Sequence, residues 1–110
     1  MVEYNGMKAF GWAQFMPYGE DTGDWEELKH IKNAIDRKAV VSHIEDESIV
    51  DFGAAAMPSE VIPETGELVE AGMYVDGPYR FPAGFLHYYR NGVVGIPHDY
   101  EEYLHREFGL

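Results

Sequence analysis

The feature that most constrains this chain is a stretch from Ala39 to Tyr79 that carries nine carboxylates and no lysine or arginine. Aliphatic and aromatic residues, among them Val40, Ile44 and Phe52, are interspersed with the acids, so one side of the stretch can be buried. A purely acidic tail would lack the apolar surface needed to fold. The sequence therefore predicts a folded segment that concentrates negative charge on its exposed side. The nine carboxylates are those of Glu45, Asp46, Glu47, Asp51, Glu60, Glu64, Glu67, Glu70 and Asp76.

The chain is of a size that predicts one globular domain, residues 1–110. It has no cysteine, which excludes disulfides, a thiolate zinc site and a cysteine nucleophile. Its apolar runs are much shorter than the roughly 20 residues that a membrane-spanning helix needs, and its first residues do not resemble a signal peptide. We therefore expect a soluble, cytoplasmic protein.

Two segments show helical patterns. Apolar residues recur at helical spacing from Trp25 to Ile35, which predicts a helix over about 25–37. Asp24 and Glu27 have the spacing of a capping box at its start. A second stripe predicts a C-terminal helix over about 98–108.

The remaining hydrophobic segments are typical of strands. Asn91-Gly92 predicts a two-residue hairpin turn, and Glu45-Asp46-Glu47 would form another hairpin tip. The fold class is then α+β, with a mostly antiparallel sheet of about five or six strands and two helices packed on one face. The six expected strands are Met7–Met16, Ala39–Glu45, Ser48–Met57, Leu68–Val75, Phe85–Arg90 and Val93–Ile96, and Val61-Ile62 could add a short edge strand.

Histidines and carboxylates near the C-terminus suggest an alternative function. His98 and His105 lie two helical turns apart with Glu101 and Glu102 between them, and these residue types suit zinc. The usual helical spacing of such ligands is four residues, and His105 is more simply a partner of Glu101. The chain has no Gly-x-Ser-x-Gly elbow and no glycine-rich phosphate loop followed by lysine. We expect no enzyme, cofactor or metal site, and keep a small metal-dependent enzyme as the alternative.

The net charge of −12 favours a basic partner. It opposes direct binding to nucleic acid or to an anionic membrane. The sequence thus predicts a small acidic inhibitor, a nucleic-acid mimic, that binds and occludes a basic nucleic-acid-acting protein. A nuclease toxin would make it an immunity protein, and a nucleic-acid-guided effector would make it a phage anti-defence, anti-CRISPR-like protein. The expected partner-binding residues are the nine carboxylates together with Tyr74 and Tyr79.

Two other readings of the same composition stay open. The acids could serve only to keep the protein soluble. The many aromatic residues could instead build a symmetric assembly, so that the chain is a homodimer rather than a monomer.

Overall fold

The computed structural model describes residues 1–4, 6–13, 21–46, 50–52, 60–61, 68–69 and 73–110. These residues form an α+β fold, which confirms the predicted class. None of the helices in these ranges is long and apolar enough to cross a membrane. The elements, in chain order, are β1 (Val2–Tyr4), β2 (Met7–Ala9), α1 (Trp25–His30), α2 (Arg37–Asp46), β3 (Val50–Phe52), β4 (Glu60–Val61), β5 (Leu68–Val69), β6 (Met73–Asp76), β7 (Tyr79–Pro82), α3 (Ala83–Arg90) and α4 (His98–Phe108).

The main sheet has five strands in the order β1-β2-β7-β6-β3, and β4 and β5 form a separate pair. β2 and β7 are parallel, whereas the other neighbours are antiparallel, so the sheet is mixed. The turn between β6 and β7 passes through Gly77, which has a φ of +57°. The parallel pair requires a long crossover between β2 and β7, and no local sequence pattern marks which distant strands will meet.

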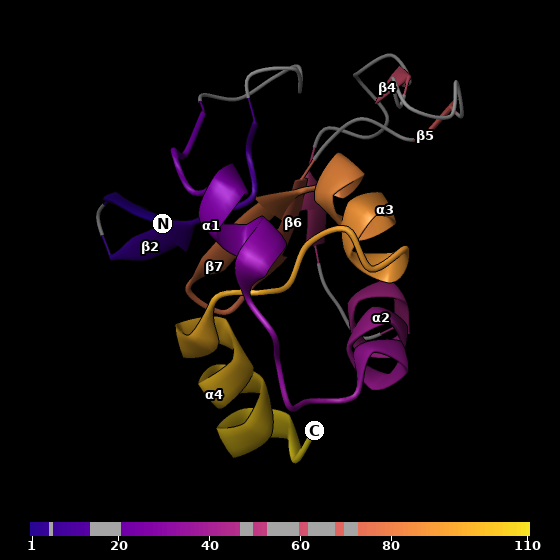
Figure 1. Ribbon diagram of the computed structural model, residues 1–110. Helices are drawn as coiled ribbons and strands as arrows, with labels where there is room; N and C mark the ends of the chain where they lie inside the picture. Colours follow the sequence, from indigo (N-terminus) through magenta and orange to yellow (C-terminus); the bar gives the residue numbers. More distant parts are fainter. Residues whose placement is uncertain (5, 14–20, 47–49, 53–59, 62–67, 70–72) are drawn as a thin grey trace.

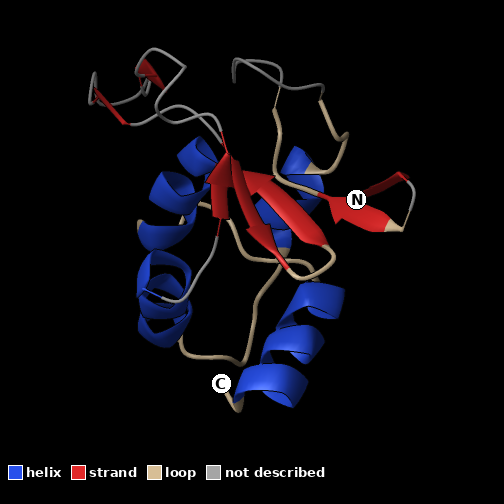
Figure 2. Ribbon diagram, turned by 180° about the vertical axis from the view of Figure 1, so that it is seen from behind, coloured by secondary structure: helices blue, strands red, loops and turns tan. Residues whose placement is uncertain are grey.

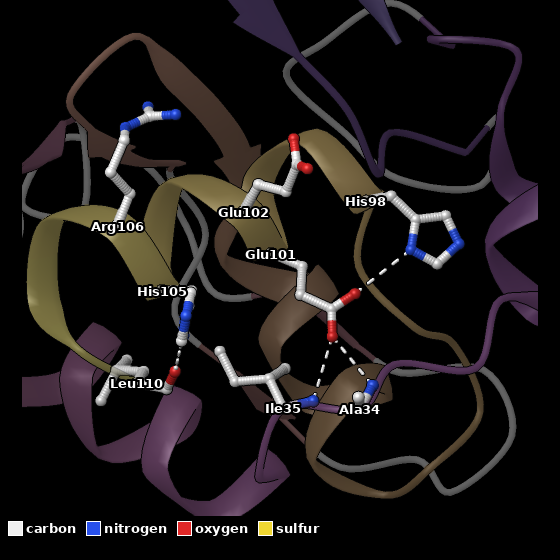
Figure 3. A pocket seen from close by; sticks show the side chains of 8 residues that line it. All are labelled: Ala34, Ile35, His98, Glu101, Glu102, His105, Arg106 and Leu110. Carbon is white, nitrogen blue, oxygen red and sulfur yellow. Dashed lines mark hydrogen bonds and ion pairs between the residues drawn. The ribbon is translucent and has the colours of Figure 1, made fainter.

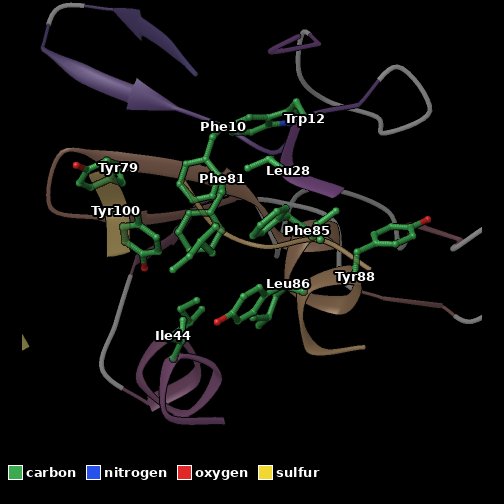
Figure 4. Close-up of a cluster of buried hydrophobic side chains, with 14 of the residues drawn as sticks. Phe10, Trp12, Leu28, Ile44, Tyr79, Phe81, Phe85, Leu86, Tyr88 and Tyr100 are labelled. Carbon is green, nitrogen blue, oxygen red and sulfur yellow. The ribbon is translucent and has the colours of Figure 1, made fainter. Parts of the chain in front are cut away.

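The four helices of the described residues lie on the same side of the main sheet (Figures 1 and 2). Between them is a core of aromatic rings (Figure 4). Phe10, Phe81 and Phe85 have no exposed surface, and Phe10 lies 5.1 Å from Phe81 and 5.4 Å from Tyr100 between ring centres. The aromatic residues that are numerous in this sequence therefore serve mainly to hold helices against the sheet.

The predicted C-terminal helix is confirmed, whereas the predicted helix over 25–37 is shorter than expected. α4 spans 98–108, as expected. α1 starts at Trp25 but ends at His30, and Ile31 is extended with a ψ of 130°. Asp24 precedes α1 without the side-chain hydrogen bond of a capping box, because its carboxylate accepts from Gly11 N and Thr22 Oγ1 instead.

Three of the predicted strands were wrong, and two of them form helices instead. Ala39–Glu45 belongs to α2, where Val40 and Ile44 are one helical turn apart and both almost fully buried. Phe85–Arg90 belongs to α3, which buries Phe85 and Tyr89 at the same spacing. In both segments, burial of a helical stripe against the sheet overrides the preference of β-branched and aromatic residues for strands.

The predicted hairpin at Asn91-Gly92 was also wrong. Gly92 does adopt a positive φ, +78°, as a hairpin turn would require. The glycine instead ends α3: its N–H donates to Tyr89 O, and Val93 N donates to Tyr88 O. The same conformational freedom therefore serves a helix C-terminus, and 93–96 follows as irregular chain.

The described residues of the other predicted strands do contain strand structure. In the described part of Met7–Met16, residues 7–13, the strand is Met7–Ala9, and Gly11 then turns the chain with a φ of +83°. Strand structure within 48–57, at 60–61 and within 68–75 corresponds to β3, β4, β5 and β6. The sequence did not predict β1.

Candidate functional site

The acids at positions 45 and 46 lie at the end of a helix rather than at a hairpin tip. Glu45 and Asp46 are in the last turn of α2, and Glu45 is exposed and paired with Arg90. The backbone of Asp51 lies in β3 and that of Glu60 in β4. The other predicted contact residues of this stretch, Glu47, Glu64, Glu67 and Glu70, lie outside the described residues.

Three predicted contact residues belong to the interior or pack against it. Tyr79 is 4% exposed and Asp76 is 5% exposed, so neither can anchor a partner at the surface. Tyr74 is partly buried, with its ring 5.6 Å from that of Phe81. Of the predicted site residues whose side chains are described, only Glu45 is therefore well exposed.

Asp76 is the centre of a buried polar cluster that the sequence did not predict. Its Oδ2 accepts a hydrogen bond from Tyr100 Oη at 2.7 Å and lies 3.0 Å from His43 Nε2. Its Oδ1 lies 3.4 Å from Tyr103 Oη. The cluster ties β6 to α2 and α4. Burial, together with the neighbouring Asp76 carboxylate, raises the pKa of the Tyr100 phenol.

Glu101 fixes the irregular segment between α1 and α2. Its carboxylate accepts hydrogen bonds from Ala34 N at 2.8 Å and Ile35 N at 3.0 Å (Figure 3). It also accepts one from Asn33 Nδ2 at 2.9 Å. His98 Nδ1 lies 3.2 Å from the same carboxylate. The expected Glu101–His105 pair is not formed. Glu101 thus satisfies backbone N–H groups that α1 would have bonded if it had continued.

These contacts line a groove of about 790 Å³ between α4 and the α1–α2 segment (Figure 3). His98 and His105 both line it, but His105 Nδ1 lies 2.9 Å from Leu110 O. No group of three or more histidine, aspartate or glutamate side chains in the described part of the chain could hold a metal ion. The metal-dependent enzyme therefore gains no support from the described residues.

We expect Glu101→Gln to lower the free energy of unfolding by about 1–2 kcal/mol at pH 7, since the amide replaces an acceptor of charged hydrogen bonds. Burial acts to raise the pKa of Glu101, but the hydrogen bonds from Asn33, Ile35, His98 and Ala34 outweigh it and hold that pKa below its ordinary value. A lowered pKa in the folded state gives stability that is present above the unfolded pKa, near 4.3, and is lost as the pH falls through the folded pKa.

Urea unfolding between about pH 7 and pH 3 tests this assignment. The wild type should lose more stability than Glu101→Gln as the pH falls through this range. Glu102→Gln is the matched control, because Glu102 is exposed on the same helix. A pH dependence of Glu101→Gln identical to that of the wild type contradicts the role given to Glu101.

The cations of the chain are mostly engaged within the protein. Arg37 donates to the carbonyl oxygens of Tyr89 and Val94 and lies over the Tyr89 ring. Several others pair with acids, and each pair lies in a different place on the fold. Because the acids far outnumber the cations, most of the negative charge remains uncompensated. The ion pairs are Lys8–Asp99 (3.9 Å), Lys29–Glu26 (3.2 Å), Arg90–Glu45 and Arg106–Glu107 (3.3 Å).

Comparisons of this chain with protein-family models, with curated proteins and with solved structures found no match. The described residues offer an acidic surface, a buried polar cluster and a mixed-charge groove. Of these features, only the acidic surface has a clear chemical complement, namely a cationic one.

Proposed function

We propose that this protein is a non-enzymatic inhibitor that binds and occludes a basic, nucleic-acid-acting protein. The observation that carries the proposal is the uncompensated negative charge. The net charge is −12, and most of the few lysine and arginine side chains are engaged by the protein's own carboxylates and carbonyl groups. Such a surface attracts a cationic partner and accelerates the encounter.

The end of α2 is the best candidate for the contact surface. Carboxylates near a helix C-terminus are unfavourable, because they face the negative end of the helix dipole. Glu45 and Asp46 occupy this position in α2, and Glu47 follows them directly in the sequence. Arg90 pairs with Glu45. The helix dipole does not favour acids at this position, which supports a role for them outside the fold.

Inhibition would follow from occupation of the lysine and arginine side chains that the target uses for nucleic acid. Affinity in such interfaces comes from a few desolvated, fully paired contacts rather than from the electrostatic field of the whole protein. The biological setting would be toxin immunity or phage anti-defence, which share this physical mechanism.

The proposal is tested by charge reversal. Immobilised wild-type protein is used to capture partners from lysates of cells that carry its gene, and the captured proteins are identified by mass spectrometry. We expect basic proteins that act on nucleic acid. The triple variant Glu45→Lys, Asp46→Lys and Glu47→Lys should slow association with the purified partner by about tenfold or more at low ionic strength.

A control with the same change in net charge distinguishes a local surface from the overall field. Glu27, Glu102 and Glu107 are exposed and lie on α1 and α4, so their reversal to lysine is the matched control. Glu101 is unsuitable because it is largely buried and holds the α1–α2 segment. Equal effects of the two triple variants would show that the end of α2 is not the contact surface. A neutral or acidic partner would contradict the proposed function itself.

A further inference from the structure

One face of the main sheet is turned away from all the helices that the structure describes (Figure 2). Strand register places Val2, Ala9, Arg80 and Val75 in one row across this face, since Ala9 pairs with both Val2 and Arg80, and Arg80 pairs with Val75. Side chains alternate along a strand, so the neighbours of Arg80 in β7, Tyr79 and Phe81, point to the helical side. Arg80 is thus a single cation within an otherwise apolar row.

A cavity of about 370 Å³ opens beside Arg80. Its apolar walls come from Val2, Met7, Ala9 and Trp12. The volume lies within the range of small-molecule sites, which combine apolar walls with a few polar groups that fix orientation. The cavity is on the sheet face and contains none of the residues proposed above to bind a partner protein.

The polar side chains at the cavity differ in how far their hydrogen bonds are satisfied. Thr22 Oγ1 donates to Asp24 Oδ1 at 2.6 Å and lies 3.2 Å from Trp12 N, so its hydroxyl is already used. The exposed Asp21 accepts from Gly23 N at 2.7 Å.

Arg80 is different. Its Nε is buried and has no hydrogen-bond partner among the described residues, and no ion pair to it is found among them. A buried charged donor without an acceptor is costly and unusual in a native structure. The Arg80 side chain as a whole is only partly buried and lines the cavity, so a ligand carboxylate there would bring acceptors to a guanidinium that has none among the described residues.

We propose that this cavity binds a small monocarboxylate with an apolar body. The carboxylate accepts hydrogen bonds from the Arg80 guanidinium, whose planar donors match carboxylate geometry. The apolar body lies against Val2, Met7, Ala9 and Trp12. A single guanidinium with the Asp21 carboxylate nearby suits one negative charge better than the two of a phosphate dianion. This site is independent of the proposed inhibitor function.

Octanoate is the probe, because it joins one carboxylate to an apolar chain. It is titrated into 15N-labelled protein while the Arg80 Nε–H and Trp12 indole resonances are followed by NMR. We expect saturable shifts at both groups. Trp25 is the internal reference, because it packs on Phe85 and Tyr88 and does not line the cavity. Acetate keeps the carboxylate without the long apolar chain, and 1-octanol keeps the chain without the carboxylate. Both should bind at least tenfold more weakly than octanoate, and inorganic phosphate should give no saturable shifts.

Variants at Arg80 complete the test. Arg80→Gln should weaken octanoate binding at least tenfold without changing the response to 1-octanol. Arg80→Lys should retain part of the octanoate affinity. Arg90→Gln, an exposed position on α3, should leave octanoate binding unchanged. Three results would each overturn the proposal: 1-octanol or phosphate binding as tightly as octanoate, an Arg80 Nε–H resonance that does not respond in the wild type, or full octanoate binding by folded Arg80→Gln. If Arg80→Gln fails to fold, the wild-type resonance and Arg80→Lys still decide the question.

Discussion

Asp76→Ala is expected to lower the free energy of unfolding by about 3–5 kcal/mol, the range for removing one partner of a buried charged cluster. The Asp76 side chain is 5% exposed and lies within 3.0 Å of Tyr100 Oη and His43 Nε2. Its removal leaves both groups buried without an acceptor, and Tyr103 loses a neighbour as well. Because these partners come from α2 and α4, the substitution loosens both helices from the sheet. Urea unfolding at pH 7 measures the loss.

Asp99→Ala is the control for this prediction, because Asp99 is exposed and its only described ion pair, with Lys8, has a long separation of 3.9 Å. Its effect should stay below about 1 kcal/mol. Asp76→Asn keeps one acceptor, so its loss in the free energy of unfolding should fall between those of Asp76→Ala and Asp99→Ala. A loss below about 1 kcal/mol for Asp76→Ala would mean that the cluster contributes little to the fold.

Phe10→Ala is expected to lower the free energy of unfolding by a similar amount, about 3–5 kcal/mol, because it leaves a cavity in the core. Phe10 has no exposed surface, and its ring lies 5.1 to 5.4 Å from those of Phe81, Phe85 and Tyr100. These rings come from β7, α3 and α4, so one side chain joins the sheet to two helices. The shift of the urea midpoint, at an unchanged slope, measures the effect.

Phe108→Ala makes the same chemical change at a side chain that is 45% exposed. It should cost about 1 kcal/mol or less, since little apolar surface is lost from the interior. Similar losses for the two variants would show that the aromatic core around Phe10 is not where the fold is most tightly packed.

The sequence predicted those elements whose local pattern and tertiary packing agree. α4 has a helical stripe that includes Tyr100 and Leu104, and both are fully buried. The prediction failed where two patterns competed. Val40, Val41 and Ile44 favour a strand by their branched side chains, but burial of Val40 and Ile44 at a spacing of four residues favours the helix that forms. Short apolar segments do not distinguish these cases by sequence alone.

The candidate site was only partly predictable for a different reason. Charge content is visible in a sequence, so the acidic surplus could be recognised at once. Which acids face solvent depends on contacts between distant segments. Asp76 follows the same local pattern as an exposed turn residue, yet it is buried by His43 and Tyr100, 33 and 24 residues away. Arg80 likewise becomes unusual only when β2 pairs with β7 and places it among apolar neighbours.

The central claim is that the negative surface steers a basic partner. The salt dependence of the association rate tests this claim most directly. The association and dissociation rate constants of the purified partner are measured by stopped flow between about 20 and 150 mM salt, over which the screening length shortens to about 8 Å. We predict that association slows by about tenfold or more while dissociation changes much less. An association rate that does not change with salt would contradict the claim.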